Sequence, residues 1–193
     1  MITYSVISVN ILYFIIMIIM GVDPINPSAY SIHFFGGNFG PDILIKGEYW
    51  RLLTSNYIHI GFMHLLFNMW CLYSIGIELE RMISSQYFII VYTLSGIFGS
   101  LCSCFLNYNI IGAGASGSIF GISGTLLIII YYLDQSSDND IQYNYSPLLF
   151  FIIYNTLFGF MVPGIDNAAH IGGLAFGFIF GLLIIKIGKL YLK

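Results

Sequence analysis

Charged side chains are rare in this sequence. Its 193 residues include six basic and nine acidic side chains, so that only 8% of the chain is charged. A soluble domain carries about 25% charged residues, whereas 58% of this chain is hydrophobic. This composition excludes an ordinary soluble protein and favours a protein embedded in the lipid bilayer. Because the net charge is −3, the sequence gives no reason to expect a nucleic-acid partner.

Cysteines and metal-binding patterns are equally scarce. The three cysteines, Cys71, Cys102 and Cys104, fall in apolar stretches and lack the spacing of metal ligands. Their odd number predicts no disulfide framework. No His-Glu-x-x-His pattern is present, so the sequence predicts neither a metal site nor a cofactor.

The few charges divide the chain into long apolar runs. A helix crosses a bilayer with about 20 apolar residues. The run 82–133 is long enough for two such helices and is interrupted by polar residues and glycines at 107–114. The other runs hold one helix each and cover residues 1–22, 52–77, 141–165 and 167–185. The pattern therefore predicts an all-α membrane protein with six transmembrane helices. They are expected at about residues 4–20, 61–77, 87–106, 116–132, 147–161 and 168–187.

Residues 21–58 are predicted to form a long, ordered loop between the first two spans. Three prolines and three glycines lie between residues 24 and 41, which is unsuited to a helix exposed to lipid. Trp50 and Arg51 are expected to hold this loop in place near the membrane interface. The first span lacks the basic start of a removable signal peptide. Residues 1–193 are therefore expected to form a single membrane domain without an added soluble domain.

Six spans place both ends of the chain on the same side of the membrane. Four basic residues then lie inside and two outside, in agreement with the positive-inside rule. The inside set is Arg81, Lys186, Lys189 and Lys193, and the outside set is Lys46 and Arg51. In this arrangement Glu80 and Arg81 are expected to form a solvated end of the second span. The acidic stretch 134–140 is expected to connect two spans on the inside.

Polar side chains gather at the starts of the second, fourth and sixth spans. His64 and Asn68 are four residues apart and share one face of the second span. Ser116 opens the fourth span, and His170 lies in the first turn of the sixth. Because these three helices run in the same direction, the four side chains are expected at one depth, near the extracytoplasmic or luminal face. Polar residues within membrane helices are by default candidates for function.

These side chains are suited to acyl transfer. Ser116 is a weak nucleophile until a base accepts its proton, and the positive end of the helix dipole favours a neutral His170 that can accept it. The backbone N–H of Ser116 has no intrahelical partner at a helix start, so it can bind an oxyanion together with the side chains of His64 and Asn68. Ser123 repeats the Gly-x-Ser-Gly spacing about 10 Å deeper in the same helix, where its N–H is bonded within the helix. Ser116 is therefore the predicted nucleophile.

The motifs around these residues resemble those of the rhomboid family of intramembrane serine proteases. In the family's order, over about residues 47–181, they are Trp50-Arg51, His64-x-x-x-Asn68, Gly114-Ala-Ser116-Gly117 and Ala169-His170-Ile-Gly-Gly173. The resemblance implies a dyad of Ser116 and His170 without a carboxylate third member, and an oxyanion site that includes His64 and Asn68. It places Phe120 where the family often carries a ring against the catalytic histidine. It also implies substrates that are single-span membrane proteins, with the fifth span and residues 162–167 as lateral gate and cap.

Glycines recur at every fourth residue of the sixth span, at Gly173, Gly177 and Gly181. This small-xxx-small pattern is typical of close contact between membrane helices. The contact is expected to bring His170 against the helix that carries Ser116.

Other classes of function fit the sequence less well than proteolysis. The main alternative is a catalytically silent rhomboid-like protein that binds membrane clients, but such a protein would be expected to lack Ser116 or His170, and both are present. Transporters and channels usually carry charged residues within their spans, and an intramembrane aspartyl protease needs two carboxylates there. No Asp, Glu, Lys or Arg lies in the middle of a predicted span. The sequence therefore favours a serine endopeptidase.

Overall fold

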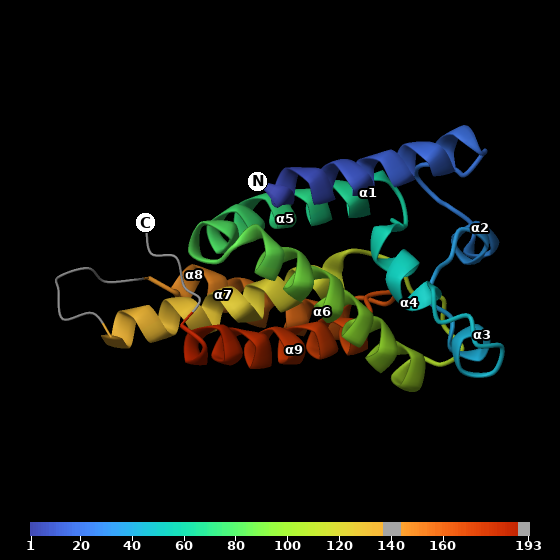
Figure 1. Cartoon of the computed structure of the whole chain (residues 1–193). Helices are drawn as coiled ribbons and strands as arrows, with labels where there is room; N and C mark the ends of the chain where they lie inside the picture. Colours follow the sequence, from blue (N-terminus) through green and yellow to red (C-terminus); the bar gives the residue numbers. More distant parts are fainter. Residues whose placement is uncertain (137–143, 189–193) are drawn as a thin grey trace.

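The computed structural model describes residues 1–136 and 144–188. Within these ranges the chain forms helices, turns and one isolated antiparallel bridge between Asn38 and Gly112. The elements are α1 (Ile2–Ile19), α2 (Ala29–Phe34), α3 (Gly40–Leu44), α4 (Arg51–Thr54), a 3₁₀ turn η1 (Ser55–Tyr57), α5 (Phe62–Met82), α6 (Ser85–Leu106), α7 (Ser116–Ser136), α8 (Ser146–Met161) and α9 (Asn167–Lys186). Figure 1 shows the long helices bundled together, with α2, α3 and α4 at the end of the bundle away from the N-terminus. Residues 137–140 of the predicted acidic stretch 134–140 lie outside the described residues, as do the predicted inside residues Lys189 and Lys193.

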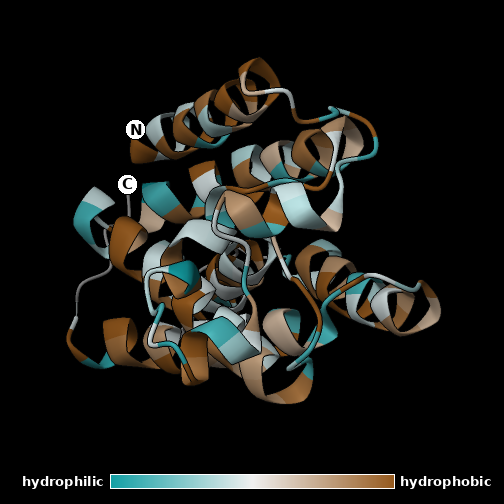
Figure 2. Ribbon diagram, turned by 90° about the vertical axis from the view of Figure 1, so that its right-hand side faces the viewer, coloured by the Kyte–Doolittle hydropathy of each residue, from teal (hydrophilic) through white to brown (hydrophobic). Residues whose placement is uncertain are grey.

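Five of the described helices are long and apolar enough to cross a membrane, namely α1, α5, α6, α7 and α9. Helix α8 is also apolar but has 16 residues. Large hydrophobic side chains are exposed on the outside of the bundle, such as Leu12 of α1, Trp70 of α5 and Ile179 of α9. Figure 2 shows hydrophobic residues throughout the helices. Since an apolar exterior of this extent is suited to lipid and not to water, the chain is a helical, multi-pass integral membrane protein.

Helix α5 is longer than the sequence predicts, because it continues past residue 77 to Met82. The carboxylate of Glu80 accepts hydrogen bonds from the first backbone N–H groups of α1 and from the hydroxyl of Ser85 at the start of α6. Glu80 is therefore only partly solvated, and it joins three helices. Arg81 is exposed and pairs with Glu78, as a solvated end would.

Helix α7 lies at the centre of the bundle. It has the largest buried share of the five long helices, and it packs against α5, α6 and α9. Its contact with α9 is close, because a methyl group on Gly173 or Gly177 would collide with the backbone of Gly117 or Gly121. The hydroxyl of Thr125 also donates to the Gly177 carbonyl at 2.9 Å. The small-residue contact predicted for α9 is confirmed.

The segment between α1 and α5 is held by buried charged groups. Arg51 is 5% exposed and donates to the backbone carbonyl of His33 at 2.7 Å and to Glu48 at 2.6 Å. Asp42 is also buried and pairs with Lys46 at 2.7 Å. The hydrogen bond from Lys46 is the main cause that holds the pKa of Asp42 below its ordinary value. These contacts confirm that Arg51 helps to hold this segment in place.

Two backbone contacts tie the same segment to the loop that precedes α7. Asn38 and Gly112 exchange backbone hydrogen bonds of 2.8 and 2.9 Å, and the Gly114 N–H donates to the Ser55 carbonyl at 2.9 Å. Gly114 has a φ of 138°, which glycine adopts more readily than other residues. Together they fix the entry into α7, whose first residue is Ser116.

Candidate active site

Ser116 and His170 lie in contact although 54 residues separate them in the sequence. Ser116 is the first residue of α7, and His170 lies in the first turn of α9. The Oγ of Ser116 and the Nε2 of His170 are 2.9 Å apart. When the serine donates this bond, a neutral His170 carries its proton on Nδ1. The ring can then accept the hydroxyl proton as the serine attacks an acyl group.

Apart from the bond to Ser116, packing holds the His170 ring. Phe120 stacks on it, with ring centroids 4.4 Å apart and planes inclined by 10°. His170 is buried, and its Nδ1 has no hydrogen-bond partner among the described residues. In the described part of the chain the arrangement is therefore a pair of residues, without the carboxylate that orients the histidine in a triad.

His64 and Asn68 lie in the first two turns of α5, next to the loop that leads to Ser116. The backbone N–H of Ile60 donates to His64 Nδ1 at 3.2 Å, which leaves the proton of a neutral ring on Nε2. A methyl group on Gly114 would lie 2.9 Å from this Nε2, so the end of the ring lies against the loop. Asn68 is buried and donates one amide hydrogen to the His64 carbonyl at 2.8 Å. The hydrogen bonds described for these two side chains do not involve Ser116.

Ser123 lies in a different environment from Ser116. It is fully buried, and its hydroxyl donates to the Ile119 carbonyl of the same helix at 2.7 Å. Of the two serines, Ser116 has a histidine within hydrogen-bond distance.

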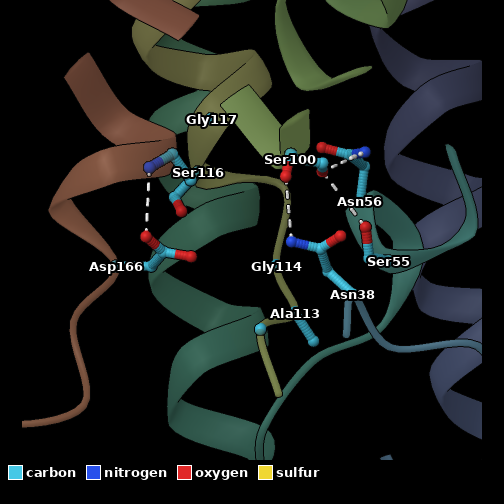
Figure 3. A pocket seen from close by; sticks show the side chains of 11 residues that line it. Asn38, Ser55, Asn56, Ser100, Ala113, Gly114, Ser116, Gly117 and Asp166 are labelled. Carbon is cyan, nitrogen blue, oxygen red and sulfur yellow. Dashed lines mark hydrogen bonds between the residues drawn. The ribbon is translucent and has the colours of Figure 1, made fainter. Parts of the chain in front are cut away.

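A polar cavity borders Ser116. Its lining comes from several elements and comprises Asn38, Ser55, Asn56, Ser100, Gly112, Ala113, Gly114, Ser116, Gly117, Asp166 and Ala169. In Figure 3, Ser116 and Asp166 lie on one side of the cavity, and Ser55 and Asn56 lie on the other. Hydroxyl, amide and carboxylate groups at this density suit the cavity to water.

Asp166 is a part of the site that the sequence-based predictions missed. In the sequence it only separates two apolar runs. In the structure its carboxylate caps α9 by accepting from the Ala169 N–H at 3.0 Å. It also accepts from Ser103 of α6 and from Asn107, the residue directly after α6. An aspartate directly before an apolar helix is a capping signal. Because this signal lies four residues before His170, it could have indicated that Asp166 caps the helix that carries the histidine.

A comparison with known protein families finds a match over most of the chain. The family model of the Rhomboid domain matches residues 46–187. The chain belongs to the rhomboid family. The matched segment contains Ser116, His170, His64 and Asn68, and it extends from the segment before α4 to the end of α9.

Named rhomboid relatives are similar to most of this chain. It is 39% identical to the rhomboid protease GluP of Bacillus subtilis strain 168 over 176 residues, which are 91% of this chain and 33% of GluP. It is 35% identical to RHOMBOID-like protein 4 of Arabidopsis thaliana over 161 residues, 83% of this chain and 40% of the plant protein. RHOMBOID-like protein 7 of the same plant is 33% identical over 162 residues, with 83% and 51% covered. The chain thus spans about a third to a half of the length of these relatives. Of these three relatives, GluP is named a protease.

Proposed function

We propose that this rhomboid protein is an intramembrane serine endopeptidase with Ser116 as nucleophile and His170 as general base. The observation that carries the proposal is the 2.9 Å contact between Ser116 Oγ and His170 Nε2, made at the starts of two membrane helices. The similarity to GluP, which is named a protease, supports it.

The first half of the reaction forms an acyl-enzyme. Ser116 Oγ attacks the carbonyl carbon of a substrate peptide bond while His170 Nε2 takes the hydroxyl proton. The tetrahedral intermediate then collapses, the peptide C–N bond breaks, and His170 gives the proton to the leaving amine. The substrate's amino-terminal part remains bound to Ser116 as an ester.

The second half of the reaction needs water. His170 takes a proton from a water molecule as that water attacks the ester carbonyl, and the proton returns to Ser116 when the ester bond breaks. The polar cavity beside Ser116 is suited to hold this water, because it is lined by hydroxyl and amide groups such as those of Ser100 and Asn56.

The negative charge of each tetrahedral intermediate needs hydrogen-bond donors. The Ser116 N–H lies at the start of α7, where it lacks an intrahelical partner. His64 Nε2–H and the second amide hydrogen of Asn68 are available from α5 because their described bonds use other atoms. We assign these three donors to the oxyanion, in keeping with the usual gain of about 10²–10³-fold in rate for one such donor.

We propose further that α8 is the fifth of six spans and that residues 1–193 form a single membrane domain. A helix of 16 residues is shorter than the ~20 that cross a full bilayer, but local thinning of the bilayer can accommodate it. Helices α5, α7 and α9 then run in the same direction. Ser116 and His170 lie near the extracytoplasmic or luminal face, where the segment between α1 and α5 forms the long first loop.

Single-span membrane proteins are the proposed substrates. The carbonyl groups of a regular helix are already hydrogen-bonded, so cleavage requires a locally unstable helix with Gly or Pro near that face. We propose helix α8 and residues 162–167 as lateral gate and cap; the light packing of α8 on α7 and α9 supports this role for α8.

The test is cleavage of model single-span substrates by the purified protein in proteoliposomes. Ser116→Ala is expected to abolish cleavage, while Ser123→Ala, the same change in the same helix, is expected to leave it. Loss of cleavage in Ser123→Ala alone would assign the nucleophile to Ser123. A folded native protein that binds a panel of such substrates but cuts none would instead be a client-binding protein.

A further inference from the structure

We infer that Asp166 is a positioning residue, whose carboxylate clamps the first turn of α9 to the last turn of α6 and so fixes His170 where it can take the proton of Ser116. The inference rests on the proposed function, and it adds a residue that contacts neither the substrate nor the serine hydroxyl.

Both carboxylate oxygens of Asp166 are engaged, by donors from two helices. One oxygen accepts from the Ala169 N–H of α9 at 3.0 Å and from the side-chain amide of Asn107 at 2.8 Å. The other accepts from the hydroxyl of Ser103 at 2.5 Å. Asn107 is the cap residue directly after α6, and Asp166 is the cap residue directly before α9. The clamp therefore joins two helix ends that are far apart in the sequence.

His170 depends on the position of its helix because little else fixes its ring. Its Nδ1 has no partner among the described residues. Stacking on Phe120 restrains the tilt of the ring, but a stacked ring can still slide within its own plane. The backbone N–H of His170 donates to the Asp166 carbonyl at 3.1 Å, so the backbone and the side chain of Asp166 both hold this turn.

A small displacement of this turn is enough to affect the reaction. The bond between Ser116 Oγ and His170 Nε2 is 2.9 Å long, and a misplacement of about 1 Å can lower a catalytic rate about 100-fold. We therefore expect removal of the clamp to lower kcat and to leave KM nearly unchanged, since the described side-chain hydrogen bonds of Asp166 hold α6 and α9 together.

Asparagine can replace Asp166 within the clamp. Asparagine caps helices as well as aspartate does, and its oxygen can accept from Ala169 and Asn107. The hydroxyl of Ser103 can rotate to accept from the new amide group. Among the described residues no lysine or arginine forms an ion pair with Asp166, so the substitution breaks no ion pair there.

The experiment compares Asp166→Ala and Asp166→Asn with the native protein and with Ser84→Ala. Ser84 caps α6 through the N–H of Tyr87, and its replacement removes a helix cap away from α9. Two rates are measured per folded molecule in proteoliposomes: labelling by a fluorophosphonate that reacts with activated serines, and cleavage of a single-span substrate. We expect Asp166→Ala to lose about 10- to 100-fold in labelling rate and kcat, and Asp166→Asn and Ser84→Ala to stay within about fivefold of native.

The outcomes separate this inference from the proposed function. If native protein is labelled at Ser116 and Asp166→Ala is labelled as fast, the clamp does not position His170 and the inference is wrong. The inference is also wrong if Asp166→Asn loses as much as Asp166→Ala, because the charge and not the clamp then matters. If native protein is neither labelled nor active, the proposed function fails, and the inference fails with it. If Asp166→Ala does not fold, Ser103→Ala and Asn107→Ala can replace it, because each removes one donor to the carboxylate. Each is expected to lower kcat by a smaller factor than the loss of Asp166. Unchanged kcat in both variants would overturn the inference.

Discussion

Replacing Gly177 by alanine is expected to push α9 away from α7. The added Cβ would overlap the backbone carbonyl of Gly121, and no side-chain rotation can relieve a clash with backbone. At Gly181 the added Cβ would lie 3.1 Å from the Thr125 carbonyl oxygen, so a shift of a few tenths of an ångström would suffice. The same substitution should therefore destabilise the protein more at position 177 than at position 181.

The size of this effect follows from three contributions. Overpacking of a tight contact costs about 1–3 kcal/mol, and the clash at Gly177 lies toward the upper end of that range. A shift of α9 also weakens the bond from Thr125 Oγ1 to the Gly177 carbonyl, which in a membrane protein is worth about 0.6 kcal/mol. The better helix propensity of alanine offsets about 1 kcal/mol. We expect a net loss of about 2 kcal/mol for Gly177→Ala and of about zero for Gly181→Ala.

The assay is the fraction of folded protein in mixed micelles as the proportion of SDS rises. Ala175→Val serves as the control, because it adds bulk at an exposed position of the same helix and should unfold like the native protein. Labelling of Ser116 per folded molecule should fall in Gly177→Ala, since α9 carries His170. If Gly177→Ala unfolds at the same SDS fraction as the native protein, the reasoning about this contact is refuted.

Three further predictions concern the oxyanion donors and the segment between α1 and α5. Replacing His64 or Asn68 by alanine should lower kcat of substrate cleavage about 100-fold with little change in KM; initial rates measure this, and unchanged kcat would remove both from the oxyanion site. Arg51→Ala leaves the buried Gly37 carbonyl and the partly buried Glu48 carboxylate without this donor, so the SDS titration should show a loss of about 3 kcal/mol, and native-like stability would contradict it. The pKa of Asp42 is lowered mainly by the bond from Lys46, so this bond stabilises the fold fully above a pH of about 4 and is lost as the pH falls through the lowered pKa. Lys46→Ala should remove that part of the acid dependence of the folded fraction, and an unchanged pH curve would speak against it.

The long helices are the part of the fold that can be predicted from sequence with simple rules. Apolar runs between charges give them directly, and the fourth predicted span begins at Ser116, as α7 does. The sequence-based prediction ends α5 too early, because a charged residue such as Glu80 indicates the end of a membrane span. In the structure its carboxylate is held by partners in α1 and α6. Such long-range partners leave no local pattern.

The short helices α2, α3 and α4 could not be predicted either. They have four to six residues. This is too few for the helical spacing of apolar residues to be recognised and too few for a helix to be stable alone. Their stability depends on contacts such as that of Arg51 with the His33 carbonyl, 18 residues away. The prediction of an ordered segment rested on its composition, which does not specify how it folds.

The candidate site divides in a similar way. Polar residues at the starts of apolar helices indicate Ser116, His170, His64 and Asn68, and their catalytic roles stay predictions. The rotation of α7 that brings Ser116 to His170 is set by packing of α7 on α9, for which the glycine repeat was a usable signal. The contacts of Asp166 with Ser103 and Asn107 depend on how α6 meets α9, which no local pattern shows.

The most direct measurement of the central claim is the site at which the native protein in proteoliposomes reacts with a fluorophosphonate, identified by mass spectrometry. A covalent adduct on Ser116 that is lost in His170→Ala, with Ser123 unmodified, is the predicted result. An adduct on Ser123, or an adduct on Ser116 that forms equally fast in His170→Ala, would contradict the assignment of Ser116 and His170 as the catalytic pair.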